Sequence, residues 1–175
     1  MYKILSILFT GYLKLRYFNR IQLSGFIILD GGFVRIDIAK RAKLIIKGHI
    51  SLRKNTQILV RENALCVIGK GSFLNRNCSV ICRENIEIGE DCLFGEDVKI
   101  YDNDHVMDSN KIYKKKFTTS KVLIGKNVWV GNNVNILKDS TIYSNSIIGA
   151  MSLVGSDLKG SGVFVGIPVK RIKSR

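Results

Sequence analysis

The sequence predicts an all-β fold, a parallel β-solenoid, and three observations support this prediction. An aliphatic residue returns every six positions, at Ile124, Val130, Ile136, Ile142, Ile148 and Val154. Four places after each of them comes a second recurring position, occupied by Val128, Val134, Ser140, Ser146, Ser152 and Leu158. A period of six matches neither the 3.6 residues of a helical turn nor the alternation of a half-buried strand. It fits a chain that turns a corner every six residues, so that each coil buries its apolar side chains against the next coil.

The repeat is less regular between about residue 33 and residue 100. The inward aliphatic position still recurs, at Ile46, Leu52, Ile58, Ile68, Leu74, Val80, Ile86, Ile88, Phe94 and Ile100. The sequence Arg-Glu-Asn stands at both 61–63 and 83–85, where the repeat shifts by a few residues. We interpret these shifts as adjusted coil corners. The prediction is one domain over residues 1–175, with a solenoid at 33–166 and a basic C-terminal tail at 167–175.

The chain is strongly basic, and the charge is concentrated at the N-terminal end. The formal net charge is +14, and residues 1–54 hold 11 Lys and Arg against two acids, Asp30 and Asp37. This distribution favours an anionic partner: a phosphate-bearing cofactor, an acidic polymer or an anionic lipid. No nucleic-acid recognition motif and no interleaving of aromatic with basic residues is present, so nucleic acid is not expected.

The four cysteines are expected to pack in the core. Cys66, Cys78, Cys82 and Cys92 lack the spacing of a zinc site, only two histidines exist to help them, and no metal is expected. Cys78 and Cys92 occupy the same small inward position as Ser140. A basic chain with free, buried thiols and no cleavage site of a secretory signal favours a reducing compartment, the cytoplasm.

Residues 1–20 are expected to form an amphipathic helix. Ile4, Leu8, Tyr12, Leu15 and Phe18 fall on one face, and most of the cations fall elsewhere. The helix has two compatible interpretations: it covers the open end of the solenoid, or it rests on the inner face of an anionic membrane. The apolar run from 4 to 12 is too short and too interrupted to span a bilayer, which needs roughly 20 apolar residues.

One segment, residues 101–121 (YDNDHVMDSNKIYKKKFTTSK), breaks the repeat and is expected to protrude as a loop. An excursion that the solenoid does not require is usually functional. Its single histidine, His105, is suited to take a proton from an alcohol near neutral pH, and a carboxylate or backbone carbonyl on the other ring nitrogen would set the tautomer. Two histidines are too few for a three-histidine zinc site, and no phosphate-cradling loop is present.

Three stretches resemble the left-handed β-helix acyltransferases of the hexapeptide-repeat superfamily, nearest to the maltose, galactoside and polysaccharide O-acetyltransferases. The run from 88 to 105, ending in Asp102-Asn103-Asp104-His105, is similar to the family segment that ends in its catalytic histidine. Residues 124–131, with Trp129, are similar to the tryptophan-bearing coil after the loop. Residues 148–156 and 166–170 are similar to the final coils and the glycine-X-proline exit. The resemblance covers roughly residues 40–173.

This resemblance implies a left-handed solenoid, acetyl-CoA as acyl donor and a homotrimer with its active sites between subunits. His105 would act as the general base, and Asp102 is the preferred group to orient it. The cofactor would contact Trp129, Gly131, Gly149 and Ala150, and the exit segment would add Pro168, Lys170, Arg171 and Lys173. The chain departs from the family at Asn103, where a second histidine is frequent, and at Lys138-Asp139, where Pro-Gly is common.

The function implied is O-acetylation of a sugar hydroxyl in bacterial surface polysaccharide biosynthesis (capsule, O-antigen or exopolysaccharide). The acceptor implied is a glycan or a sugar nucleotide, and acidic and lipid-linked acceptors both stay open. Two alternatives stay open: N-acetylation of an amino sugar on a nucleotide carrier, and a non-catalytic trimeric scaffold.

Overall fold

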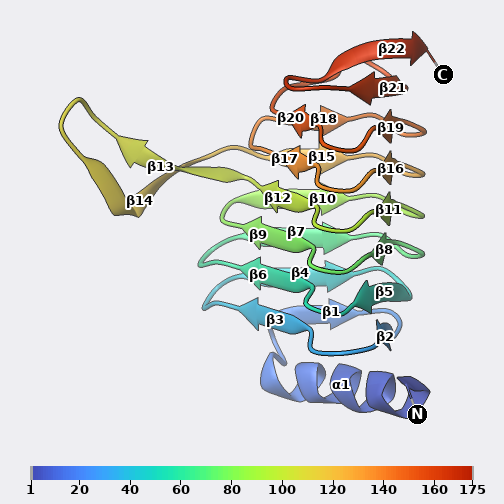
Figure 1. Ribbon diagram of the computed structural model, residues 1–175. Coiled ribbons are helices and arrows are strands. Elements are labelled where there is room, and N and C mark those ends of the chain that lie inside the picture. Colours follow the sequence, from blue (N-terminus) through green and yellow to red (C-terminus); the bar gives the residue numbers. More distant parts are fainter. Residues whose placement is uncertain (1, 175) are drawn as a thin grey trace.

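In the computed structural model, which describes residues 2–174, the chain is a parallel β-solenoid with a helix at its N-terminal end and a long hairpin on its side (Figure 1). The all-β prediction is therefore confirmed. Three parallel sheets form the sides of the solenoid, and each coil contributes one strand to each of them. Within the described residues, sheets A and C have six strands each and sheet B has eight.

Sheet A consists of β1 (Ile21–Leu23), β4 (Lys43–Ile46), β7 (Leu65–Ile68), β10 (Asn85–Ile88), β15 (Val122–Ile124) and β18 (Thr141–Ile142). Sheet B consists of β2 (Ile27–Asp30), β5 (Ile50–Arg53), β8 (Phe73–Leu74), β11 (Leu93–Phe94), β16 (Trp129–Val130), β19 (Ile147–Ile148), β21 (Gly162–Val165) and β22 (Lys170–Ser174). Sheet C consists of β3 (Arg35–Ile38), β6 (Gln57–Val60), β9 (Ser79–Cys82), β12 (Lys99–Tyr101), β17 (Asn135–Ile136) and β20 (Leu153–Val154). The hairpin consists of β13 (Asn103–Met107) and β14 (Ile112–Thr119).

The predicted aliphatic ladder forms the core. All six positions of the exact repeat, from Ile124 to Val154, are at most 3% exposed. In that region a coil takes 18 residues, since Ile124 pairs with Ile142. Near the N-terminal end a coil takes 22 residues, since Leu44 pairs with Cys66. The longer coils have four-residue strands, which explains why the six-residue period is less regular there.

Small buried residues line the second recurring position and bond to the neighbouring coil. Ser72 Oγ donates to the carbonyl of Gly89 at 2.9 Å, and Ser140 Oγ to that of Val154 at 3.2 Å. The thiols of Cys78 and Cys92 lie 3.1 Å from the equivalent carbonyls of Gly95 and Gly125. All four cysteines are free and buried, so their predicted role in core packing is confirmed.

Three boundaries differ from those predicted. The solenoid begins at Ile21 rather than at 33, because short strands β1 and β2 already pair with β4 and β5. The helix α1 is Tyr2–Arg16, shorter than 1–20. Residues 170–174 are not a free tail, since β22 pairs antiparallel with β21.

The helix α1 covers the N-terminal end of the solenoid, as predicted, but the face that contacts the solenoid is not the predicted apolar face. The buried residues are Ser6, Thr10 and Leu13, together with Tyr17 just beyond the helix. Ser6 Oγ accepts the Leu29 N–H at 2.9 Å and Thr10 Oγ1 accepts the Ile27 N–H at 3.1 Å, so hydroxyls pair with the otherwise open edge of β2. The predicted apolar face, from Ile4 to Phe18, is exposed.

Candidate functional site

The hairpin β13–β14 leaves the solenoid at the corner between sheet C and sheet A, after β12 and before β15 (Figure 1). The prediction that 101–121 protrudes is confirmed, and the segment is an ordered pair of strands. Asn103 pairs with Thr119 and His105 with Phe117, and the register shifts between His105 and Met107. Most of the hairpin side chains are exposed. The hairpin is therefore held at its base and along its length by specific contacts.

His105 is exposed, and its ring is fixed by the opposite strand. Its Nδ1 lies 3.1 Å from the carbonyl oxygen of Tyr113. Because a carbonyl can only accept, this contact requires a proton on Nδ1 and leaves Nε2 of the neutral ring as the free acceptor. The ring also packs on Phe117, with centroids 4.5 Å apart and planes tilted by 40°. The result is an imidazole in the tautomer that a general base needs.

Phe117 in turn contacts an arginine of the solenoid. The guanidinium carbon of Arg83 lies 3.4 Å from the centre of the Phe117 ring, a cation–π contact between the hairpin and the preceding coil. Burial, together with the nearby charge of Arg61, lowers the pKa of Arg83. The sequence analysis missed Arg83, Tyr113 and Phe117. Tyr113 and Phe117 are the only aromatic residues in 102–121 and stand four apart, which puts them on one face of a strand and could have identified them.

Asp102 does not orient His105, and that assignment is corrected. The Asp102 carboxylate is fully buried and accepts the backbone N–H of Arg83 at 2.8 and 3.0 Å and that of Glu84 at 2.7 Å. Asn103 Nδ2 donates to the same carboxylate at 3.1 Å. Asp102 therefore fixes the base of the hairpin to the coil below. The contact to His105 Nδ1 that was expected from Asp102 is made by the carbonyl of Tyr113.

Lys138 and Asp139, which stand where the family commonly has Pro-Gly, hold the other side of the hairpin base. Lys138 Nζ lies 3.6 Å from Asp104 Oδ2, and Ser120 Oγ donates to Asp139 Oδ1. Lys138 and Asp139 belong to the corner directly above the hairpin, between β17 and β18. A Pro-Gly pair could make neither contact. The departure thus gives this hairpin two anchors of its own.

The tip of the hairpin is organised by Asp108. Its carboxylate accepts the N–H groups of Asn110 at 2.9 Å and Lys111 at 3.0 Å, and the Tyr113 hydroxyl at 2.8 Å. These bonds lower the pKa of Asp108, with the Asn110 N–H making the largest contribution. The run at 114–116 presents three exposed lysines next to this tip. The hairpin thus carries a concentrated positive charge beside the histidine.

The residues predicted to bind a cofactor lie on sheet B and on the corner between sheets B and C. Trp129 points outward from β16 and is 52% exposed, between Leu93 and Ile147 in the neighbouring coils. Gly131, Gly149 and the exposed Ala150 stand at the adjoining corner. A Cβ on Gly131 would lie 2.6 Å from the Ala150 nitrogen, so coil stacking alone already requires glycine there.

The predicted phosphate-binding residues lie in the C-terminal strand and in the turn before it. Lys170 and Lys173 are exposed on β22, and Pro168 is exposed in the turn. Arg171 is different, because its Nη2 donates to the carbonyl of Lys159 at 2.9 Å and its guanidinium packs over Phe164. Arg171 therefore ties β22 to the last corner, and its exposed guanidinium keeps further N–H donors beside the two lysines.

The predicted site residues do not meet within one chain. His105 and Asp102 belong to the corner between sheets C and A, whereas Gly131, Gly149 and Ala150 belong to the corner between sheets B and C. In Figure 1 the hairpin extends away from the stack on the side opposite β16 and β19. The outward face of sheet C separates the two groups, so one chain alone carries two half-sites on different edges.

Comparisons with known proteins agree with this fold. A family model described as "Bacterial transferase hexapeptide (six repeats)" matches residues 121–156. A comparison with curated protein sequences finds no match.

Three solved structures are similar over most of the chain. AntD, an N-acyltransferase from Bacillus cereus solved with dTDP-4-amino-4,6-dideoxyglucose and coenzyme A, is 19% identical with a TM-score of 0.76, covering 94% of this chain and 88% of AntD. The polySia-specific acetyltransferase NeuO is 24% identical with a TM-score of 0.60, covering 88% of this chain and 74% of NeuO. A maltose O-acetyltransferase from Clostridium difficile 630 is 29% identical with a TM-score of 0.57, covering 79% of this chain and 68% of that enzyme. The chain therefore carries hexapeptide repeats at 121–156, and its solenoid fold is similar to those of solved acyltransferases.

Proposed function

We propose that this protein is an acetyl-CoA-dependent O-acetyltransferase that modifies a sugar hydroxyl in bacterial surface polysaccharide biosynthesis (capsule, O-antigen or exopolysaccharide). The observation that carries the proposal is the contact between His105 Nδ1 and the Tyr113 carbonyl at 3.1 Å. In the neutral ring this contact makes Nε2 the acceptor, on an exposed imidazole beside a basic hairpin. The 29% identity to a maltose O-acetyltransferase supports the same chemistry.

In this mechanism the hydroxyl oxygen of the acceptor attacks the carbonyl carbon of the thioester. His105 Nε2 accepts the proton that this hydroxyl loses. The bound thioester supplies an activated acetyl group, whose transfer forms a C–O bond and breaks the C–S bond. His105 then returns the proton to the departing sulfur. Phe117 and the Tyr113 carbonyl hold the ring in place during both proton transfers. General-base assistance of this kind contributes roughly 10²–10⁴ in rate.

The residues on the other edge fit an acyl-CoA. Trp129 offers an exposed apolar ring, and the corner at Gly131 and Ala150 offers a surface of small residues. Lys170 and Lys173 are exposed ammonium groups suited to phosphates. Arg171 is exposed too, and the N–H donors that its bond to the Lys159 carbonyl does not use are suited to the same role.

Because the two half-sites lie on different edges, the proposal requires a homotrimer. In a cyclic trimer, the hairpin edge of one subunit meets the Trp129 edge of its neighbour, and the contact repeats until the ring closes. Each of the three active sites would then combine His105 from one subunit with the thioester groove of the next.

The charge of the hairpin supports an acidic or lipid-linked glycan as the acceptor. Lys114, Lys115 and Lys116 stand next to the histidine, in a chain of net charge +14. The cytoplasm is the proposed compartment, since acetyl-CoA and sugar nucleotides are available there. A peripheral position at the inner face of the membrane is argued separately below. Among residues 2–174 no helix combines the length and apolar character needed to span a bilayer.

Two other functions are kept for the test. N-acetylation of an amino sugar on a nucleotide carrier is favoured by the similarity to AntD, which was solved with a dTDP-amino sugar. A non-catalytic trimeric scaffold would share the fold and require no base.

The deciding experiment supplies acetyl-CoA with capsule and O-antigen fragments, and in parallel with nucleotide-linked amino sugars, and measures release of the free CoA thiol. Product with hydroxyl acceptors that disappears in His105→Ala supports the proposal. Product only with amino acceptors would establish N-acetylation. No thiol release, together with no rise in melting temperature when acetyl-CoA is added, would leave the scaffold function.

A further inference from the structure

The helix α1 presents its apolar side chains to solvent. Seven large apolar residues near this end are 46–85% exposed: Ile4, Leu5, Ile7, Leu8, Tyr12, Leu15 and Phe18. The face that meets the solenoid uses Ser6, Thr10 and Leu13 instead. A helix that only capped the solenoid would bury its apolar face. Contiguous exposed apolar surface of this kind marks an interaction site.

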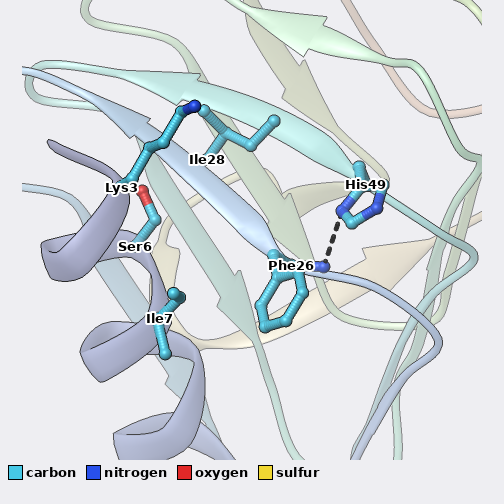
Figure 2. Close-up of a pocket in the computed structure, with 6 residues that line it drawn as sticks. All are labelled: Lys3, Ser6, Ile7, Phe26, Ile28 and His49. Carbon is cyan, nitrogen blue, oxygen red and sulfur yellow. Dashed lines mark hydrogen bonds between the residues drawn. The ribbon is translucent and has the colours of Figure 1, made fainter.

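An apolar cleft continues this surface onto the solenoid. Figure 2 shows Ser6 and Ile7 of α1 facing Phe26, directly before β2, and Ile28, within β2, with Lys3 and His49 also lining the cleft. The cleft has a volume of about 360 Å³. His49 holds one wall in place, since its Nδ1 accepts the Phe26 N–H at 3.0 Å and its ring stacks on that of Phe26 at 5.6 Å. The cleft is therefore a built extension of the helix face.

Every charged side chain on or directly after α1 is positive, and the acids of the adjoining strands, Asp30 and Asp37, are paired with Arg53 and Arg61. Lys3, Lys14, Arg16 and Arg20 lie on or directly after α1, and the first acid in the sequence is Asp30. A second copy of the chain docked on the same face would bring these cations together, which is unfavourable. An apolar face with basic flanks instead matches the surface of an anionic bilayer, where ammonium and guanidinium groups meet phosphates and the apolar side chains enter the acyl boundary.

We propose that α1, with the cleft at Ile7, Phe26 and Ile28, docks this protein on an anionic phospholipid bilayer. The helix crosses the N-terminal end of the solenoid, opposite β22, so the coils would stand away from the bilayer (Figure 1). The hairpin follows β12, the fourth described strand of sheet C. The strand β12 lies three strand spacings, or about 14 Å, beyond the first strand of that sheet, β3. In the proposed trimer the three helices would face the same bilayer and bind with avidity.

The test measures co-sedimentation of the full chain with phosphatidylcholine vesicles that contain about one third phosphatidylglycerol, and with pure phosphatidylcholine vesicles. Leu8→Glu and Leu15→Glu add one negative charge each to the proposed surface. Ile172→Glu is the matched control, since Ile172 (64% exposed) and Leu8 (63% exposed) are equally accessible but lie at opposite ends of the molecule. Melting temperatures and size-exclusion profiles without vesicles verify folding and assembly.

We expect binding to the anionic vesicles only, weaker at high salt, about tenfold weaker in Leu8→Glu and Leu15→Glu, and unchanged in Ile172→Glu. Equal binding of wild type and Leu8→Glu, or equal binding to neutral vesicles, would overturn the proposal. A change of oligomeric state in Leu8→Glu or Leu15→Glu would also overturn it, by showing that a second copy covers this face. No acyl donor or acceptor is present, so the outcome is independent of the proposed transferase activity.

Discussion

The Nδ1 atom of His105 lies 3.1 Å from the carbonyl oxygen of Tyr113, on the opposite strand of the same hairpin. A backbone carbonyl fixes the tautomer without adding a charge beside the imidazole. Because the orienting group is the backbone carbonyl of residue 113, it does not depend on the side chain at that position. The pairing of the two hairpin strands is therefore sufficient to orient the His105 ring.

Replacing His105 with alanine is expected to lower the rate of acetyl transfer by about 10²–10⁴. The melting temperature should hardly change, because the ring is exposed. Initial rates of CoA thiol release measure the effect. The other histidine gives the control: His49→Asn keeps an acceptor for the Phe26 N–H and should retain activity. Equal losses in both variants would argue against His105 as the base.

Active sites shared between subunits predict complementation between two inactive chains. His105→Ala removes the base, and Ala150→Trp fills the proposed groove at an exposed corner. Neither variant alone should be active. Co-expressed trimers should recover about a quarter of the wild-type activity, because a site works only where an intact hairpin meets an intact groove. Absence of any recovery in verified mixed trimers would show that each site lies within one chain.

Asp102 is expected to stabilise the fold rather than tune the base. Asp102→Ala leaves the backbone N–H groups of Arg83 and Glu84 without their acceptor, at a cost of about 1–3 kcal/mol in the free energy of unfolding. Urea titration measures this loss. The adjacent Asp104 is the control, since its ion pair with Lys138 at 3.6 Å is exposed and Asp104→Ala should cost less than about 1 kcal/mol. Unchanged stability with lost activity in Asp102→Ala would restore it as a partner of His105.

Burial raises the pKa of the Cys78 thiol from 9.0 to about 11. The folded state therefore favours the neutral thiol, and this contribution to stability is complete below pH 9 and is lost as the pH rises toward 11. Melting temperatures between pH 8 and pH 11 should fall more in wild type than in Cys78→Ser. The serine should be tolerated, because Ser72 makes the same contact in the preceding corner of sheets A and B. Equal pH dependence in both proteins would contradict a shifted Cys78.

Much of the solenoid could be predicted from the sequence because its core is a linear repeat. Each aliphatic residue packs on its equivalents one coil away, so the six-residue period from Ile124 to Val154 reports the tertiary contacts directly. The hairpin was visible for the same reason, as a break in that period. The first coil was missed, although β1 and β2 pair normally and their buried Ile21 and Ile27 stand six residues apart.

The candidate site was predicted only in part. His105 stood out as the one histidine of the protruding segment, but its neighbours depend on strand register, which sequence alone did not supply. Arg83 lies 34 residues before Phe117 along the chain, yet its guanidinium packs 3.4 Å from that ring. The resemblance favours Asp102 as the partner of the imidazole, whereas the coil below offers the Asp102 carboxylate two backbone N–H groups.

The sequence by itself determined the repeat, the buried ladder and the position of the hairpin, because these follow from periodicity along the chain. Only the tertiary structure decided which face of α1 meets the solenoid. The open edge of β2 presents backbone N–H groups, and the hydroxyls of Ser6 and Thr10 satisfy them where Ile4 and Leu8 could not. Because the unpaired N–H groups of β2 need acceptors, the hydroxyl face of α1 packs on the solenoid and the apolar face points outward. The helix sequence alone does not show that these N–H groups lie beside it.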